Sequence, residues 1–285
     1  MSSVVNRPLT GELAAAAERV ASLLEAAAPL GVAFSGGVDS SVLLALAVRA
    51  LGPGHVVAIL GVSPSLGSDE RLAAHDVAAF TGARLVEVQT KETVNPAYRA
   101  NGPDRCFHCK NELFTRIADE VAGAYGLAAV AYGENADDAM RPDRPGSRAA
   151  TSHKVLRPLA EAGLGKVAVR AIARALELPS ADKPAAPCLA SRIPHFQEVS
   201  EAKLAQIDTA ERALRTLGFA ESRVRHHGEV ARIELPVSDL ARAVSAPTRE
   251  QIHAAVTAAG FQFAAIDVLG IQSGAFTLSV LGSRD

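Results

Sequence analysis

The chain has 285 residues, of which 48% are hydrophobic and 21% are charged, and it carries a net charge of −2. This composition supplies a packed core, suits two domains and excludes wholesale disorder, and the lack of a basic excess gives no sign of a nucleic-acid partner. The N-terminus has no signal-peptide pattern, and no apolar run reaches the roughly 20 residues that span a bilayer. We therefore expect a cytoplasmic protein that binds neither nucleic acid nor membrane.

The first part of the chain alternates helical and strand patterns. Short apolar runs predict buried strands over 30–35, 55–62, 84–89 and 127–133. Apolar residues at helical spacing predict helices over 10–27, 38–52, 68–82 and 104–122. Because strands and helices alternate, we predict an α/β fold with a doubly wound parallel sheet.

The pattern changes after the Pro-rich stretch 178–196. Beyond it the sequence predicts a helix over 200–217, strands over 222–227 and 230–235, helical segments within 237–260, and strands near 262–268 and 276–281. This order is typical of an α+β domain. We therefore expect a larger domain over 1–195 and a smaller α+β domain, for substrate binding or oligomerisation, over 196–285.

The strongest motif is "VAFSGGVDSS" at 32–41, where a predicted strand runs through Gly36 and Gly37 directly into a predicted helix. The two glycines let an anion approach the backbone N–H groups, and the helix start adds unpaired N–H groups and a positive dipole end. Ser35 and Ser40 add hydroxyl donors. The segment predicts an anion site. It is not a Walker A loop, which needs Gly-Lys-Ser/Thr, nor a dinucleotide fingerprint, which needs a third glycine.

The six residues "SGGVDS" resemble the PP-loop of the N-type ATP pyrophosphatases, an adenine nucleotide alpha hydrolase-like fold, at every position. That family grips the pyrophosphate of ATP and transfers AMP to an oxygen of its substrate, so ATP and Mg²⁺ are implied as cofactors. "YGENADD" at 132–138 resembles a second segment of the family. The resemblance implies pyrophosphate binding by Ser35, Gly36, Gly37, Asp39 and Ser40, Mg²⁺ near Asp39, nucleotide contacts at Gly61, Val62 and Gly133, and Mg²⁺ or substrate at Asp137 and Asp138. A solvated acidic helix start is the alternative for the last two.

The chain has three cysteines, Cys106 and Cys109 in "RCFHCK" and Cys188 in "APCLASR". Thiols stay reduced in the cytoplasm, so the Cys-x-x-Cys pair indicates metal binding or redox chemistry rather than a structural disulfide. The residues alone leave three alternatives open: a zinc site with His108 or His195, a redox pair that regenerates a persulfide on Cys188, and inert buried thiols.

Three further segments narrow the substrate: "PDRCFHCKNELF" (103–114), "DKPAAPCLASRIP" (182–194) and "SRVRHHGEVARIE" (222–234). With the PP-loop they resemble the LarE family of ATP-dependent sulfur transferases. That family converts the carboxylates of pyridinium-3,5-biscarboxylic acid mononucleotide to thiocarboxylates for the nickel-pincer nucleotide cofactor. The resemblance implies a small nucleotide as substrate and a homo-oligomer, either trimer or hexamer. It also implies sulfur from Cys188 itself or from a 4Fe–4S cluster on Cys106, Cys109 and Cys188.

Arginines complete the predicted site. Arg223 and Arg225 share one face of a predicted strand, and they match family residues that hold the substrate phosphate. Arg192 lies four residues after Cys188 and is predicted to steady an adenylate or to favour the thiolate. The alternative for Arg223 and Arg225 is a charged outer strand face, and the alternative for Arg192 is a surface salt bridge. Glu134, where the family often has Thr, and His195-Phe196, where it often has Tyr-Gly, depart from the pattern.

The interpretation that we carry forward is an adenylating sulfur transferase. Three others stay open at this point. A PP-loop tRNA thiolase is disfavoured by the neutral charge, because tRNA binding rests on phosphate neutralisation. An ammonia-using amide synthase resembling NAD synthetase would not need Cys188. A nucleotide-sensing module would bind ATP without turnover.

Overall fold

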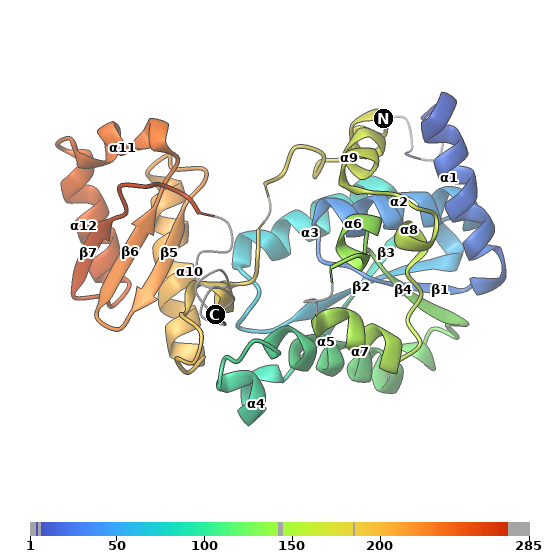
Figure 1. Cartoon of the computed structure of the whole chain (residues 1–285), viewed down its shortest axis with the longest axis horizontal. Coiled ribbons are helices and arrows are strands. Elements are labelled where there is room, and N and C mark those ends of the chain that lie inside the picture. The colour runs from blue at the N-terminus through green and yellow to red at the C-terminus, as the bar shows by residue number, and fades with distance from the viewer. Residues whose placement is uncertain (1–3, 5–6, 142–144, 185, 273–285) are drawn as a thin grey trace. The chain divides into compact units, whose positions relative to one another are not determined.

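The computed structural model describes all residues except 1–3, 5–6, 142–144, 185 and 273–285 (Figure 1). The chain divides into two compact units. The first unit comprises Met1–Ser63, Asp69–Glu92 and Cys106–Ala186, and the second comprises Pro64–Ser68, Thr93–Arg105 and Pro187–Asp285. None of the described helices is long and apolar enough to cross a membrane.

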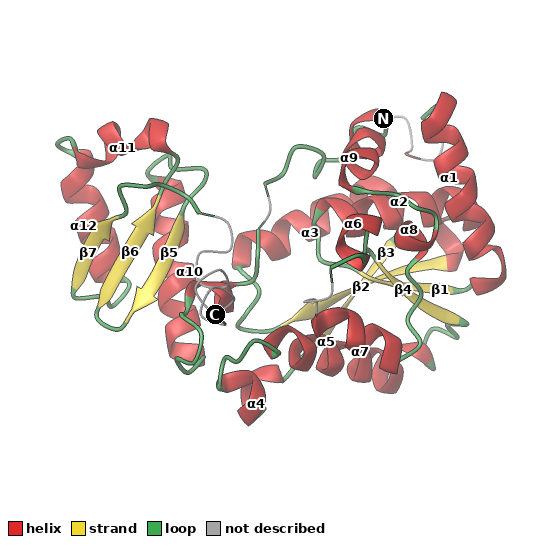
Figure 2. Ribbon diagram, in the orientation of Figure 1, coloured by secondary structure: helices red, strands yellow, loops and turns green. Residues whose placement is uncertain are grey.

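The first unit is built on a four-stranded parallel sheet in the order β3-β2-β1-β4 (Figure 2). The strands are β1 Leu30–Ala33, β2 Val56–Val62, β3 Arg84–Gln89 and β4 Ala129–Tyr132. In the register, Leu30 of β1 lies opposite both Val56 and Ala129. β1 is buried along its whole length, as expected for a central parallel strand. The predicted parallel α/β fold is confirmed.

The predicted helices of the first unit form. They are α1 Gly11–Leu24 with the short turn Glu25–Ala27, α2 Val38–Leu51, α3 Ser68–Thr81, and α5 Arg105–Arg116, which continues as a π-helical turn over Ile117–Ala122. The strand order reverses between β1 and β4, so α2 and α5 cover opposite faces of the sheet, as Figure 1 shows. Such a switch point opens a crevice at the carboxyl ends of the two strands, where α/β proteins bind ligands.

Several helices of the first unit were not predicted. They are α6 Ala136–Ala139, α7 Pro145–Ser152, α8 Pro158–Glu161 and α9 Lys166–Ala175. In α9 the buried residues Val169, Ile172 and Ala173 have helical spacing, so the signal was present. It is weakened by Val167, an apolar residue of the same helix that points to solvent.

The second unit has a small sheet in the order β5-β6-β7, with β5 Arg223–His227, β6 Val230–Glu234 and β7 Phe263–Ile266. β5 and β6 are antiparallel, and β7 runs parallel to β6. The helices of this unit are α4 Pro96–Arg99, α10 Glu201–Thr216, α11 Val237–Val244 and α12 Thr248–Ala258, with a 3-10 turn at Leu189–Arg192. The predicted small α+β arrangement is confirmed, and the strand predicted near 276–281 lies outside the described residues.

Candidate functional site

The PP-loop lies at the switch point, between the end of β1 and the start of α2. Gly36 has φ of +70°, and a Cβ there would lie 3.0 Å from the Cα of Ala74, so a side chain would meet both backbone strain and a clash. The first turn of α2 has no side-chain cap, and Gly37 is its N-cap. The backbone N–H groups of this turn are therefore donors suited to an anion.

The serine hydroxyls fold the loop onto itself. Ser40 Oγ donates to the carbonyl of Gly37 at 3.0 Å and accepts from the backbone N of Ser35 at 3.3 Å. The Oγ atoms of Ser35 and Ser40 are 3.2 Å apart. Both hydroxyls thus lie beside the first turn of α2, and their predicted contacts with pyrophosphate stay predictions.

Gly133, at the end of β4, allows that strand to pack against the start of α2. A Cβ at Gly133 would lie 2.6 Å from the backbone N of Ser40 and 2.8 Å from the carbonyl carbon of Asp39. Backbone atoms cannot move aside as a flexible side chain can. The absence of a side chain at Gly133 therefore lets the chain after β4 pack directly against the backbone of the PP-loop. Its predicted contact with nucleotide stays a prediction.

Asp39 is the acidic residue of the PP-loop, and both of its carboxylate oxygens have protein partners. Asn135 donates from Nδ2 to Oδ1 at 3.0 Å, and the ammonium of Lys166 contacts Oδ2 at 2.5 Å. Asn135 is buried, whereas the Lys166 side chain is 40% exposed. Carboxylate oxygens are ligands that Mg²⁺ takes, so Asp39 is chemically suited to the metal, and its predicted role in holding Mg²⁺ stays a prediction.

Asp137 and Asp138 position these two partners. Asp137 Oδ2 accepts the backbone N–H of Lys166 at 2.6 Å and so caps the N-terminus of α9. Asp138 Oδ2 accepts from Asn135 Nδ2 at 3.0 Å, and the side chain of Asn135 caps α6 in return. The predicted role of both aspartates as direct ligands of Mg²⁺ or substrate stays a prediction.

Gly61 and Val62 lie where the sequence predicts them, at the carboxyl end of β2 next to β1. Both are half-buried. A Cβ at Gly61 would lie 2.9 Å from Cδ1 of Leu113 in α5, a side chain that can shift. Both residues lie at the carboxyl edge of the sheet, where α/β proteins bind ligands, and their predicted contact with the nucleotide stays a prediction.

Cys106 and Cys109 lie three residues apart on α5, so their side chains project from one side of the helix. Cys106 is exposed and Cys109 is half-buried. The neighbouring side of α5 is fixed by two cation–π contacts: Arg148 lies 5.1 Å from the ring centroid of Phe107, and the Lys110 ammonium lies 4.1 Å from that of Tyr132. The pair is therefore presented by a firmly packed helix.

Cys188 belongs to the second unit and is exposed. It directly precedes the 3-10 turn Leu189–Arg192. Three hydrogen bonds fix this turn: Leu189 N donates to Ser65 O at 3.0 Å, Arg105 Nη1 donates to Ala190 O at 3.0 Å, and Ser191 N donates to Cys188 O at 2.9 Å. Within the described residues, no three His, Cys, Asp or Glu side chains gather as a metal-binding set.

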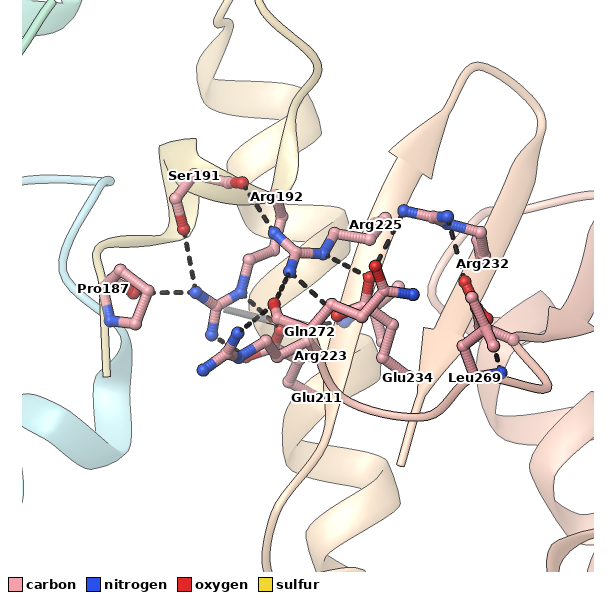
Figure 3. Close-up of polar contacts among 12 residues, drawn as sticks. Pro187, Ser191, Arg192, Glu211, Arg223, Arg225, Arg232, Glu234, Leu269 and Gln272 are labelled. Atoms are coloured by element: carbon pink, nitrogen blue, oxygen red, sulfur yellow. Dashed lines mark hydrogen bonds and ion pairs between the residues drawn. The ribbon is translucent and has the colours of Figure 1, made fainter. Parts of the chain in front are cut away.

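The second unit also holds what we call the arginine cluster, which consists of Arg192, Arg223 and Arg225 (Figure 3). Arg192 is 5% exposed and pairs with Glu211, its Nε lying 2.9 Å from Oε1. Arg225 is 3% exposed and binds the fully buried Glu234 through two contacts, at 2.9 and 2.8 Å. Both guanidiniums are buried, so Arg225 does not lie on an exposed outer strand face, and Arg192 forms its salt bridge with Glu211 in the interior rather than at the surface. The predicted contacts of these arginines with substrate stay predictions.

The arginine cluster brings three guanidiniums together with the buried carboxylates of Glu211 and Glu234. Burial lowers the pKa of Arg223, and the charges of Arg192 and Arg225 lower it further. Burial disfavours the charged form of this guanidinium, and a bound anion would offset part of that cost. Guanidiniums can bind phosphate bidentately, and the predicted binding of the substrate phosphate here stays a prediction.

Sequence comparison places these features in a family. The model of the asparagine synthase family matches residues 13–101, which include the whole PP-loop. Over 243 residues, 85% of this chain and 87% of the relative, the chain is 32% identical to pyridinium-3,5-bisthiocarboxylic acid mononucleotide synthase of Lactiplantibacillus plantarum. The chain belongs to the LarE family of ATP-dependent sulfur transferases. The resemblance inferred from the PP-loop, cysteine and arginine segments is confirmed.

Two other relatives have no stated function. An uncharacterized protein of Synechocystis sp. is 40% identical over 243 residues, which cover 85% of this LarE-family chain and 90% of the relative. An uncharacterized protein of Methanocaldococcus jannaschii is 32% identical over 145 residues, 51% of this chain and 56% of the relative.

Sequence reasoning missed four residues that contact predicted site residues of this LarE-family chain. They are Asn135 and Lys166 beside Asp39, and Glu211 and Glu234 beside the arginines. Glu211 left a signal, because it follows Leu204, Ile207 and Ala210 on the buried side of α10, where a charge has to be paired. Lys166 left no signal, because a half-exposed lysine in the first turn of an amphipathic helix is common. Its contact with Asp39, 127 residues away in the sequence, exists only in the folded chain.

Proposed function

We propose that this LarE-family protein adenylates the carboxylates of pyridinium-3,5-biscarboxylic acid mononucleotide and converts them to thiocarboxylates during synthesis of the nickel-pincer nucleotide cofactor. The name of the Lactiplantibacillus plantarum relative supports this product. The PP-loop, complete and placed at the switch point of the sheet, supports the use of ATP.

One observation carries the proposal: guanidiniums of the arginine cluster hydrogen-bond directly to the backbone of the turn that bears Cys188. Arg192 Nη1 donates to the carbonyl of Pro187, the residue before Cys188, at 2.8 Å. Arg225 Nη1 donates to the carbonyl of Ser191 at 3.0 Å. The backbone on both sides of the Cys188 thiol therefore accepts hydrogen bonds from guanidiniums of the arginine cluster. A substrate held there by its phosphate would have its ring near the sulfur-bearing turn.

The first chemical step activates a carboxylate. One carboxylate oxygen attacks the α-phosphorus of ATP, the bond from that phosphorus to the bridging oxygen breaks, and pyrophosphate leaves with the electron pair. The N–H groups of α2 and the hydroxyls of Ser35 and Ser40 would hold the pyrophosphate. Asp39 would hold Mg²⁺, which neutralises phosphate charge when bound. The product is an acyl adenylate, whose AMP group is a good leaving group.

The second step transfers sulfur, and the cysteines offer two routes. In the first, the Cys188 thiolate attacks the acyl carbon, AMP leaves and a thioester forms. Loss of the Cα proton of Cys188 then breaks its Cβ–Sγ bond, so the substrate departs as a thiocarboxylate and dehydroalanine remains in the chain. In the second route, a hydrosulfide supplied from outside displaces AMP and the protein is unchanged.

The second route needs Cys106, Cys109 and Cys188 together as ligands of a 4Fe–4S cluster. Thiolates are the ligands that iron–sulfur clusters take, so these three cysteines would hold the cluster, which would supply an iron site for sulfur delivery. The cysteine pair shares one side of α5. Arg105, the residue before Cys106, donates to the carbonyl of Ala190, two residues after Cys188. Both features support this ligand set.

The test is anaerobic purification followed by one round of turnover with Mg·ATP and the bis-carboxylate mononucleotide. Iron content, visible absorption, pyrophosphate release and intact protein mass are measured. A brown protein of unchanged mass supports the cluster route, and a colourless protein lighter by the elements of H₂S supports the sacrificial route. Failure of the substrate to stimulate pyrophosphate release contradicts the proposed function.

Cysteine variants separate the two steps. Cys188→Ala is expected to keep substrate-dependent pyrophosphate release and to form no thiocarboxylate, since adenylation does not involve the thiol. Cys106→Ala is the matched variant, because it abolishes product only in the cluster route. A Cys188→Ala protein that makes thiocarboxylate at the wild-type rate would contradict both routes.

The proposal also includes a cytoplasmic homo-oligomer, either trimer or hexamer, with a small nucleotide as its partner. Membership in the LarE family supports this assembly. Light scattering on the purified protein tests it, with an expected mass of three or six chains of 29.5 kDa. A monomer at working concentration would contradict it.

A further inference from the structure

The acidic residue of the PP-loop is paired with a lysine from a distant helix. Lys166 is the first residue of α9, and its Nζ lies 2.5 Å from Oδ2 of Asp39. Oδ1 of Asp39 is held separately by Asn135. One oxygen of the carboxylate is therefore fixed by a buried amide, while the other carries a cation on a long side chain.

The backbone of Lys166 is held firmly, whereas its side chain is not. Asp137 accepts the Lys166 N–H at 2.6 Å, and the backbone N of Ala136 donates to the carbonyl of Leu164 at 2.8 Å. The Lys166 side chain is 40% exposed, compared with 21% for Asp39. An ammonium on a four-carbon stem can rotate among acceptors within reach of a fixed backbone. The backbone therefore keeps the ammonium of Lys166 within reach of Asp39, while the mobile side chain lets another cation take its place on the carboxylate.

Binding of a polyphosphate changes which charged groups are favourable partners for Asp39 and for Lys166. A bare carboxylate next to phosphate oxygens is repelled, and a divalent cation on Asp39 removes that repulsion. The ammonium and a divalent cation compete for the same Oδ2 atom. Once displaced, the ammonium of Lys166 lies beside the start of α2, where the most favourable acceptors are phosphate oxygens.

We propose that Lys166 is an exchangeable counter-charge of the PP-loop. It neutralises Asp39 until a divalent cation takes that carboxylate, and its ammonium then passes to the pyrophosphate portion of ATP. No covalent bond changes in this exchange. The inference rests on the proposed use of ATP, and it adds Lys166 as a residue that contacts the substrate.

The exchange predicts effects of opposite sign on two ligands, which a purely structural ion pair does not. Lys166→Met removes a competitor for Asp39, so the protein should bind Mn²⁺ severalfold more tightly. The same variant loses a charged donor to phosphate, so it should bind Mg·pyrophosphate roughly tenfold to a hundredfold more weakly. Mn²⁺ serves as the probe because it takes oxygen ligands as Mg²⁺ does.

The experiment uses the full chain. Mn²⁺ binding is followed by the electron paramagnetic resonance signal of free Mn²⁺, and Mg·pyrophosphate binding by titration calorimetry. Arg174→Gln is the matched control, because Arg174 lies on the same helix and pairs with the exposed Asp182. It should leave both affinities unchanged. Lys166→Arg keeps the charge and should bind Mg·pyrophosphate nearly as tightly as wild type, which keeps the test valid if the Met variant does not fold.

The outcomes separate the inference from the proposed function. If wild type does not bind Mg·pyrophosphate, the proposed use of ATP fails. If wild type binds it but Lys166→Met weakens both ligands together, Lys166 is a structural tether and the exchange is overturned. Unchanged affinities for both ligands overturn it as well. Tighter Mn²⁺ with weaker Mg·pyrophosphate supports it.

Discussion

At the scale of single residues, Phe196 is held in an unfavourable backbone conformation. Its φ is +64°, in the left-handed region, although its side chain is 69% exposed. The conformation is imposed by Asn101, whose carbonyl accepts the N–H of Phe196 and whose side chain donates to the carbonyls of Ile193 and Pro194. A left-handed conformation costs a non-glycine residue about 1–2 kcal/mol, and exposure leaves the phenyl ring little burial to offset it.

We expect Phe196→Gly to raise the free energy of unfolding by about 0.5–1 kcal/mol. Glycine removes the strain of about 1–2 kcal/mol but adds entropy to the unfolded chain worth about half of that gain. Phe196→Ala is the matched control, because it removes the ring and keeps the Cβ that causes the strain. Urea unfolding of the three proteins measures the difference. Equal gains for Ala and Gly would show that the ring, rather than the backbone, sets the cost.

At the scale of elements, the four parallel strands and the helices before and after the PP-loop were predictable because each carries a local signal. β1 is a short apolar run that ends at glycines, and α2 is apolar nearly all round. The PP-loop itself was predictable for the same reason. The partners of Asp39 were not, because Asn135 and Lys166 reach it only when β4 and α9 have packed beside α2.

The pairing of buried charges in the second unit was equally hidden from the sequence. Arg225 lies in β5 and Glu234 lies in β6, and the hairpin register places them near one another. Sequence spacing placed Arg223 and Arg225 on one face of a strand but could not show whether that face is buried. Burial is set by which elements cover the strand, and that is a tertiary property.

The capping of α9 leads to a prediction at this scale. Asp137→Ala should lower the free energy of unfolding by about 0.5–2 kcal/mol, because the N–H of Lys166 loses its acceptor at the helix start. It should also weaken Mg·pyrophosphate binding, since the backbone of Lys166 is no longer fixed. Asp137→Asn keeps an acceptor oxygen and should retain most of both properties. Urea unfolding and titration calorimetry provide the measurements.

The same pair of variants tests the alternative role of Asp137. A direct ligand of Mg²⁺ needs its negative charge, so in that case Asp137→Asn would abolish Mg·pyrophosphate binding while leaving stability nearly unchanged. If Asp137→Asn retains Mg·pyrophosphate binding and Asp137→Ala loses it, Asp137 is a capping residue that positions Lys166.

At the scale of the whole molecule, the second unit is discontinuous in sequence. It includes Pro64–Ser68 and Thr93–Arg105 in addition to the C-terminal part of the chain. Ser68 Oγ donates to Asp208 at 2.9 Å, and Thr93 Oγ1 donates to Glu201 at 2.9 Å. The turn after Cys188 belongs to this unit too, because Arg192 supplies the partner of Glu211.

Cutting the chain after residue 195, the boundary predicted from the sequence, therefore separates Arg192 from Glu211, its partner in a buried ion pair. In a fragment of residues 196–285, Glu211 keeps its place on the buried side of α10 but loses Arg192. Removing one partner of a buried ion pair costs about 3–5 kcal/mol, a large fraction of the 5–15 kcal/mol that stabilises a typical domain. We expect this fragment to show no cooperative thermal unfolding by circular dichroism.

A fragment of residues 187–285 is the matched comparison, because it retains Arg192 and the contact of Arg225 with the carbonyl of Ser191. It still lacks Thr93–Arg105, so it should be less stable than the same unit in the full chain but more structured than residues 196–285. Arg192→Met in the full chain isolates the ion pair from the loss of backbone, and it should lower the denaturation midpoint of the second unit. Equal cooperative unfolding of the two fragments would mean that the buried pair contributes little and that the α+β unit folds from its C-terminal residues alone.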